Sequence, residues 1–438
     1  MRKHLQTYTS KYFAFFAIFY TLFTVVLSRT GSGFYILGFR LGEIAVGLSI
    51  LFYIFSIIVF KYEYKYFRLK IILLLIATSF FISNIYYKSS MQDLYVFRTS
   101  SYIWFLSFLL VGVHSKKIVI KENYDKYFYV LLLYIYTSGI LGAESNLLKF
   151  FANLSDKIEF HKGSEILLIF ICFFFLKNNF RTRTVNSYLI FIFFISVYTP
   201  FLMYKSRAAF IALIIFIIFE TYYFITDLKF NKNIFLSTLL IILIVGTLST
   251  IISQNALVPD FENFPELIKS SYSNIISERY SLYDSELPFV YFDNGRMFTA
   301  DGNLNWRIQM WQDMFHYIGQ SSKYMLFGIG FGEMLPVFDV TLFDDAKFRL
   351  GLDGLNEHLH NFFLTVFARG GLVHLLLLAS VFVFVYSEYS RIHKDKKILI
   401  VLICVFFVSF FDSSMENAHF PAIFYFFLGN QLINKSKL

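Results

Sequence analysis

The feature that most constrains the fold of this chain is a series of long apolar runs separated by short polar connections. A membrane-spanning helix needs about 20 consecutive apolar residues. A window of that length gives twelve candidate spans, near residues 11–28, 41–60, 70–87, 95–113, 127–142, 163–177, 187–204, 207–226, 233–253, 361–387, 397–412 and 419–433. Only 16% of the residues are charged, against about 25% in soluble domains. The sequence therefore predicts an all-α polytopic membrane protein with about twelve transmembrane helices.

One long polar segment interrupts this pattern between the ninth and tenth spans. It divides the chain into residues 1–253 with nine spans, a loop over 254–356, and residues 357–438 with a re-entry segment and three spans. The loop is rich in Asp, Glu, Asn and Ser, and its apolar periodicity predicts helices near 263–280 and 303–319. We therefore expect a large, partly helical loop outside the membrane.

The lysines and arginines indicate how the chain is oriented. More than half of the 39 basic residues fall in seven short segments. These are the two termini and every second connection between the predicted spans, so they share one side of the membrane. Cytoplasmic segments carry an excess of such residues, so both termini are expected in the cytoplasm and the loop at 254–356 outside. The net charge of +9 follows from this topology, and no nucleic-acid partner is needed to account for it.

A short outer turn before the eighth span contains a candidate anion site. Ser206 is a suitable N-cap for the helix that follows. The positive end of that helix dipole would then lie beside Lys205 and Arg207, and this combination favours anion binding. An interfacial role at the lipid headgroups is the alternative for these two basic side chains.

The second predicted loop helix places an arginine on its apolar side. At about 100° per residue, the apolar side chains gather within about 40° of Arg307; they are Trp311, Met314 and Ile318. The polar side chains fall on the opposite face, which we expect to be wet; they are Gln309, Gln312, Asp313 and His316. A charge on a buried stripe is costly unless it is paired. The partner is either a protein carboxylate or a ligand phosphate, which the guanidinium fork binds bidentately.

The segment that re-enters the membrane after the loop contains candidate catalytic residues. His360 is followed by Asn361, and Glu357 and His358 are close by. Histidine exchanges a proton near neutral pH, so this group suggests acid–base chemistry, with a structural histidine as the alternative.

Arg369 lies further along the same segment and is followed by two glycines. In a continuous helix it would be about 13 Å beyond His360, and a charge within the membrane suggests function. Alternatively, Gly370 and Gly371 break the helix, leaving residues 357–369 at the interface and 372–387 as the span.

A glycine-rich stretch, Phe327-Gly328-Ile329-Gly330-Phe331-Gly332-Glu333, precedes the re-entry segment. It follows no strand of a βαβ unit and lacks a Lys-Ser/Thr pair, which argues against a nucleotide site. A tight turn that passes close to another part of the backbone is the better interpretation.

Together these features resemble the O-antigen polymerase and O-antigen ligase superfamily of bacterial membrane glycosyltransferases. The resemblance rests on the topology and on Ser206-Arg207-Ala208, Trp306-Arg307, Gly328-Ile329-Gly330-Phe331-Gly332, and His360-Asn361 followed by Gly371. The family commonly has a further glycine three residues after the last of these, where this chain has His374. We expect this departure to affect helix packing more than chemistry.

The resemblance implies a C-type, inverting, metal-independent transfer with no cofactor. The donor would be a glycan on undecaprenyl diphosphate at the periplasmic face of the bacterial inner membrane. By motif position, Arg207 and Arg307, together with Lys205, would bind the diphosphate, and His360 would be the general base. Accessory candidates are Asn361, His358, Glu357, Arg98 and Arg369.

Polymerases and ligases of this superfamily share the donor and differ in the acceptor, which is a lipid-linked repeat unit or lipid A–core. The composition, with 59 Phe and 31 Tyr, resembles O-antigen cluster polymerases more than ligases. We therefore expect a polymerase, with a ligase as the alternative and a chain-length regulator as a candidate protein partner. A flippase is less favoured, because the halves show no convincing repeat and the notable charges gather at one face.

Overall fold

The structure is a computed structural model, and it describes residues 2–59, 66–90, 93–114, 125–141, 155, 161–178, 184–228, 232–254, 290–293, 295–299, 302–337 and 358–432. Glu357 and the helix expected near 263–280 lie outside these ranges.

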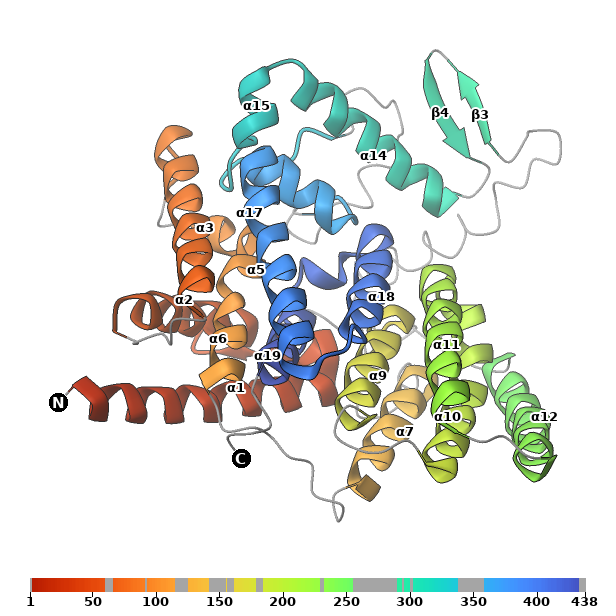
Figure 1. The fold of residues 1–438 in the computed structure, drawn as a ribbon. Coiled ribbons are helices and arrows are strands. Elements are labelled where there is room, and N and C mark those ends of the chain that lie inside the picture. Colours follow the sequence, from red (N-terminus) through yellow and green to blue (C-terminus); the bar gives the residue numbers. More distant parts are fainter. Residues whose placement is uncertain are drawn as a thin grey trace. The chain divides into compact units, whose positions relative to one another are not determined.

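Helices coincide with all twelve expected spans. The long ones are α1 (Arg2–Ser32), α2 (Leu41–Val59), α3 (Phe67–Tyr86), α10 (Val185–Lys205), α11 (Arg207–Asp227), α12 (Lys232–Gln254) and α17 (Phe362–His393) (Figure 1). Each contains a stretch long and apolar enough to cross a membrane. Shorter apolar helices are α7 (Asp125–Leu141), α9 (Gly163–Asn178), α18 (Ile398–Phe411) and α19 (Phe420–Gln431). The expected all-α polytopic class is confirmed.

The expected fourth span is divided into three helices, α4 (Leu94–Thr99), α5 (Ser101–Trp104) and α6 (Leu106–His114). At the first break, the hydroxyl of Ser100 donates to the carbonyl of Val96 over 2.7 Å. Thr99 donates to the carbonyl of Phe331 over 2.8 Å. Hydroxyl side chains that bond to nearby carbonyls compete with the helical pattern, which accounts for the interruption at this point.

Within the described ranges the strands form two small antiparallel hairpins, which leave the all-α class unchanged. The first pairs β1 (Tyr35–Ile36) with β2 (Phe39–Arg40), and the second pairs β3 (Val290–Asp293) with β4 (Arg296–Thr299). The part of the chain that the structure describes also contains α14 (Gly302–Gly319), α15 (Ser322–Phe327) and the 3₁₀ turn η3 (Ser413–Met415). The predicted second loop helix is therefore confirmed as α14.

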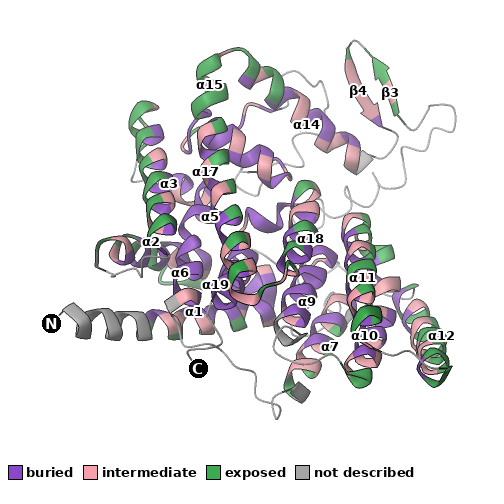
Figure 2. Ribbon diagram, viewed as in Figure 1, coloured by how far each residue is buried: buried purple, intermediate pink, exposed green. Residues whose placement is uncertain are grey.

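The chain forms two compact units. The first unit comprises Met1–Phe67, Ser101–Val258 and Phe382–Leu438. In it, α6 and α19 pack closely at two glycines: a Cβ on Gly429 would lie 2.2 Å from the carbonyl oxygen of Leu109. Every residue of α19 is buried, whereas α12 has only three buried residues and exposes its apolar side chains (Figure 2). An exposed apolar surface of this kind suits contact with lipid.

The second unit comprises Arg68–Ser100 and Pro259–Val381, with α3, α4, α14, α15 and the first part of α17. Its core joins one face of α14 to the glycine-rich stretch and to α17 through Met310, Met314, Ile318, Ile329, Leu335, Val337, Leu359, Leu364 and Ala368. The predicted burial of Met314 and Ile318 is therefore confirmed. The core fixes the re-entry segment against α14.

The polar face of α14 is not wet as expected, because the β3–β4 hairpin covers much of it. Gln309 and Asp313 are 1% and 3% exposed. Asp313 Oδ1 lies 2.7 Å from Arg296 Nη2, and Gln309 Nε2 donates to the carbonyl of Met297 over 2.8 Å. Of the four residues expected on the wet face, His316 is exposed. Helical periodicity separated the two faces correctly, but it does not reveal which segment covers the polar one.

Helix α17 is broken at Gly371, where φ is 68° and ψ is −173°. This confirms the interpretation in which the glycine pair interrupts the helix. A Cβ on Gly371 would lie 2.3 Å from the carbonyl carbon and oxygen of Leu326. Glycine is needed here both for the left-handed φ and for the close approach of the two backbones.

Candidate active site

His360 occupies a strained backbone position immediately before α17. Its φ is 51°, a region that non-glycine residues seldom adopt. The flanking hydrogen bonds hold this conformation: the N–H of Leu359 donates to Thr365 Oγ1 over 3.1 Å, and the N–H of Thr365 donates to the carbonyl of Asn361 over 2.9 Å. Strain that neighbouring contacts maintain is typical of functional positions, so His360 remains the leading candidate for chemistry.

Asn361, an expected accessory residue, caps α17. Its Oδ1 accepts a hydrogen bond of 3.1 Å from the N–H of Leu364, and the side chain is buried. An N-cap amide oxygen satisfies an N–H group that has no partner within the helix. Asn361 therefore has a structural role that fixes where α17 begins, two residues after His360.

Two tryptophans of α14 contact the segment around His360. The indole N–H of Trp311 donates to the carbonyl of Leu359 over 2.8 Å. The ring of Trp306 packs against the ring of His360 with centroids 4.9 Å apart and planes at 64°. This edge-on arrangement is a favoured aromatic geometry, and it limits how the imidazole can rotate.

Arg307 is half-buried on the same helix. It precedes Trp311 by four residues, so the two side chains share a face of α14. Because Trp311 contacts Leu359, this face of the helix is directed toward the re-entry segment. The structure thus gathers Arg307 and His360 in one region of the second unit, together with half-buried His358.

Arg369 is fully buried and holds the glycine-rich stretch. Its Nη1 donates to the carbonyls of Glu333 and Gly330, the latter over 3.4 Å. Its Nη2 donates to the hydroxyl of Tyr95 over 2.9 Å, and the guanidinium lies 5.4 Å from the centre of that ring. These contacts use most of the donors of the guanidinium, which gives Arg369 a structural role in the second unit.

The glycine-rich stretch passes close to the backbone of α17, as the sequence predicted. The N–H groups of Ile329 and Gly330 donate to the carbonyls of Ala368 and Arg369 over 2.8 and 3.0 Å. A Cβ on Gly328, whose φ is 72°, would lie 2.4 Å from the carbonyl oxygen of Arg369. The stretch is therefore a backbone clamp on α17.

The departure from the family pattern at His374 is accommodated by packing within the second unit. The side chain is fully buried, its ring lies 5.7 Å from that of Phe331, and Nδ1 lies 3.3 Å from the hydroxyl of Ser79.

The predicted anion site at the start of α11 belongs to the first unit. Ser206 caps the helix as expected, because its hydroxyl accepts a 3.3 Å hydrogen bond from the N–H of Ala209. The side chains of Lys205 and Arg207 are exposed. Among the accessory candidates, Arg98 is half-buried in the last turn of α4, in the second unit.

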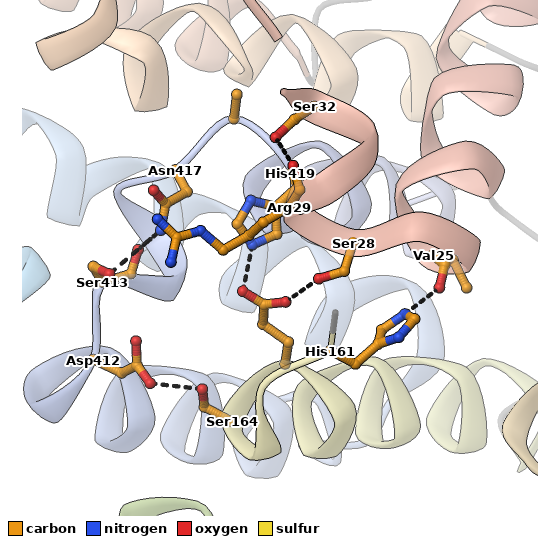
Figure 3. A network of polar contacts seen from close by, with 12 residues as sticks. Val25, Ser28, Arg29, Ser32, His161, Ser164, Asp412, Ser413, Asn417 and His419 are labelled. Atoms are coloured by element: carbon orange, nitrogen blue, oxygen red, sulfur yellow. Dashed lines mark hydrogen bonds and ion pairs between the residues drawn. The ribbon is translucent and has the colours of Figure 1, made fainter. Parts of the chain in front are cut away.

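The sequence did not reveal a buried polar network in the first unit, where α1, α9 and α19 meet (Figure 3). Glu165, which is 2% exposed, accepts hydrogen bonds from Ser28 Oγ and from His419 Nε2, the latter over 2.5 Å. Nearby, His161 Nε2 donates to the carbonyl of Val25 over 2.6 Å. A carboxyl group inside an apolar run is a signal that could have pointed to this network.

These elements define a multi-pass α-helical membrane protein. In it, a strained histidine of the re-entry segment, His360, contacts the helix that bears Arg307. A family model described as O-antigen ligase matches residues 167–379, from α9 into α17. The predicted resemblance to the O-antigen polymerase and ligase superfamily is thereby confirmed over these residues. Members of this family are membrane glycosyltransferase-like enzymes. A comparison with curated proteins gave no match.

Proposed function

We propose that this protein is an O-antigen polymerase of the bacterial inner membrane. It would transfer a growing glycan from undecaprenyl diphosphate to a lipid-linked repeat unit at the periplasmic face. The observation that carries the proposal is the placement of His360, held at a φ of 51° and packed against Trp306 on the helix that bears Arg307. The family match supports glycan transfer of the polymerase or ligase type.

In the proposed reaction, His360 is the general base. The imidazole takes the proton from an acceptor hydroxyl, and the acceptor oxygen forms a bond to the anomeric carbon of the donor glycan. The bond from that carbon to the phosphate oxygen breaks on the opposite face, and the diphosphate leaves with the electron pair, so the anomeric configuration is inverted. A positioned base of this kind contributes about 10²–10⁴-fold to a rate.

The arginines would stabilise the negative charge that develops on the leaving diphosphate. Arg307 is half-buried, where a charge–phosphate interaction is less screened by solvent than at a fully exposed site. Arg207 and Lys205 flank the start of α11, whose dipole adds positive potential. Guanidinium groups bind phosphate oxygens bidentately, so we propose that the step proceeds without a metal ion or a cofactor.

The accessory residues would act around this centre. His358 and Glu357 lie two and three residues before His360 in the chain and would assist the chemistry there, and Arg98 would contribute positive charge. Asn361 and Arg369 would act indirectly, through the helix cap and the backbone clamp in which they take part. In the proposed orientation both termini are cytoplasmic and the site faces the periplasm, as the distribution of basic residues indicates.

An O-antigen ligase, which transfers the glycan to lipid A–core, is the second candidate function. The matching family model is described as O-antigen ligase, and the match supports both functions alike. The chemistry at His360 would be the same, because the two reactions share the donor and differ only in the acceptor.

One experiment tests the proposal and separates these two functions. Cells carrying the matching polysaccharide cluster would express the intact protein, His360→Ala or Arg307→Ala at equal membrane levels, and the lipopolysaccharide would be separated on a gel. Core with a single repeat unit is expected from the variants, because ligation survives when polymerisation is lost. Bare core with long chains on the lipid carrier would identify a ligase. A normal ladder from both variants would overturn the proposed chemistry.

The polymerase proposal also includes a protein partner. A chain-length regulator would set the modal length of the ladder. Its removal is therefore expected to change the distribution of lengths and leave the presence of polymer unchanged.

A further inference from the structure

The first turn of α9 is held by side chains from three other elements of the first unit (Figure 3). Ser164 Oγ donates to Asp412 Oδ2, after the end of α18, over 2.6 Å. Glu165 accepts from His419 at the start of α19 over 2.5 Å, and from Ser28 in α1. Ser164 and Glu165 are 1% and 2% exposed. Directed hydrogen bonds from three sides fix both the position and the rotation of this turn.

The free-energy cost of burying a carboxyl group limits how much the group can add to the stability of the fold. Removing the group from water is costly, and a buried ion pair often contributes no more than apolar residues of similar volume. Here the carboxyl also stabilises an unusual backbone, because its partner Ser28 has φ 51° and ψ −138° inside α1. The charge of Arg29, the next residue, also acts on Glu165. The arrangement therefore fixes geometry at the meeting point of these helices.

The residue at the start of this turn touches the turn that bears the anion site. A Cβ on Gly163 would lie 3.1 Å from Ser206 Cβ and 3.3 Å from Lys205 Cβ. The backbone of α9 therefore packs directly against the cap of α11. Arg207 is the first residue of that helix. A shift of the first turn of α9 would therefore move Lys205 and Ser206, the two residues that precede Arg207.

We propose that Glu165 is a positioning residue that, through the first turn of α9, fixes the Lys205–Arg207 turn for binding the diphosphate of the lipid-linked donor. This inference rests on the proposed function, and it adds a residue that itself touches no substrate. Glu165 fixes the first turn of α9 through its hydrogen bonds with His419 and Ser28. Because Gly163 in that turn packs against Ser206, the position of Ser206 depends on Glu165. Loss of the carboxylate loosens the anion site while the base at His360 is unchanged.

The test compares Glu165→Gln and Gly163→Ala with a matched control, Glu220→Gln. Glu220 is buried to the same degree in α11, about 20 Å along the helix from Arg207 at 1.5 Å per residue. For the purified full-length protein in lipid nanodiscs, we expect both test variants to raise KM for the lipid diphosphate donor about ten-fold and to change kcat less than three-fold. This pattern is expected when a mutation weakens binding of the ground state and of the transition state equally. The control should keep the KM of the intact protein at a comparable thermal stability.

A second measurement does not depend on glycan transfer. Binding of inorganic pyrophosphate to the same proteins would be measured by calorimetry. Glu165→Gln and Gly163→Ala are expected to weaken it about ten-fold, as a displaced anion site predicts. Arg207→Gln should abolish it, and the Glu220→Gln control should leave it unchanged.

The outcomes separate this inference from the proposed function. Unchanged KM and pyrophosphate affinity in both test variants would overturn the positioning role, as would pyrophosphate binding that does not depend on Arg207. Pyrophosphate binding with the expected pattern, in a protein that transfers no glycan, would overturn the proposed function and leave the positioning role standing. Gly163→Ala keeps the test decisive if Glu165→Gln does not fold, because it leaves the charge network intact.

Discussion

The indole ring of Trp306 packs against the imidazole of His360 at 4.9 Å, across 54 residues of chain that include the end of the polar loop. The loop helix therefore contributes to the site and orients the proposed base. Arg307 follows Trp306 directly, so the same helix that orients the histidine also brings the arginine. This relationship leads to the first prediction.

Replacing Trp306 should impair the orientation of the base. An aromatic pair of this geometry contributes about 0.5–1.5 kcal/mol beyond its buried area. Trp306→Ala should therefore lower the rate of glycan transfer about ten-fold, since about 1.4 kcal/mol corresponds to a factor of ten. Trp306→Phe keeps an aromatic edge and should retain most of the rate. Equal rates for the Ala variant and the intact protein, at equal membrane levels, would contradict the orienting role.

Substitutions of Asn361 should separate helix capping from direct chemistry. Serine caps helices about as well as asparagine, whereas alanine costs about 1 kcal/mol. Asn361→Ser should keep both thermal stability and transfer, and Asn361→Ala should lose both in part. If Asn361→Ser folds normally but transfers no faster than the alanine variant, Asn361 has a direct chemical role in addition to the cap.

Arg369 should be required for the clamp on the glycine-rich stretch. Hydrogen bonds to charged groups contribute about 1.5–3 kcal/mol each. Arg369→Met leaves the carbonyls of Gly330 and Glu333 without this donor. We expect its unfolding free energy to fall by about 3 kcal/mol or more, and we expect proteases to cut faster near residues 328–337. Tyr95→Phe removes one acceptor only and should lose less stability. A normal melting temperature for Arg369→Met would argue against the clamp.

The stability of the first unit should depend on pH through His161. Burial removes this side chain from water and so disfavours its protonated form, which lowers its pKa from the usual value of 6.5. Its Nε2–H donates to the carbonyl of Val25, and its Nδ1 lies 2.7 Å from the hydroxyl of Ser138. The unfolded chain binds a proton more readily, so this contribution is present above about pH 6.5 and is lost as the pH falls toward and through the lower pKa of the folded protein.

The measurement is a series of thermal melts of the intact protein and of His161→Gln between pH 7.5 and pH 4.5, a window chosen around the ordinary histidine pKa of about 6.5. The intact protein should lose more stability than the variant as the pH falls. Parallel curves would mean that His161 does not titrate differently in the folded and unfolded states.

Several features of the candidate site follow from local sequence. The Ser206 cap, the break at Gly371 and the close approach at Gly328 were all predicted, because capping and left-handed glycine geometry depend on a few adjacent residues. The side of α14 that bears Arg307 also followed from helical periodicity. The covering of Gln309 and Asp313 by the β3–β4 hairpin could not be predicted in this way, since periodicity identifies a face and not the segment that packs on it.

The sequence by itself determined the class of this protein, its apolar helices and its candidate residues, because hydrophobicity, helix caps and glycine turns act over short stretches of chain. Only the tertiary structure decided what those residues contact. Arg369 bonds to Tyr95 from 274 residues away, and Glu165 bonds to His419 across 254 residues. Such pairs form when packing brings distant helix ends together and when a buried polar group must find a partner. No local pattern in the chain specifies which distant residue that partner will be.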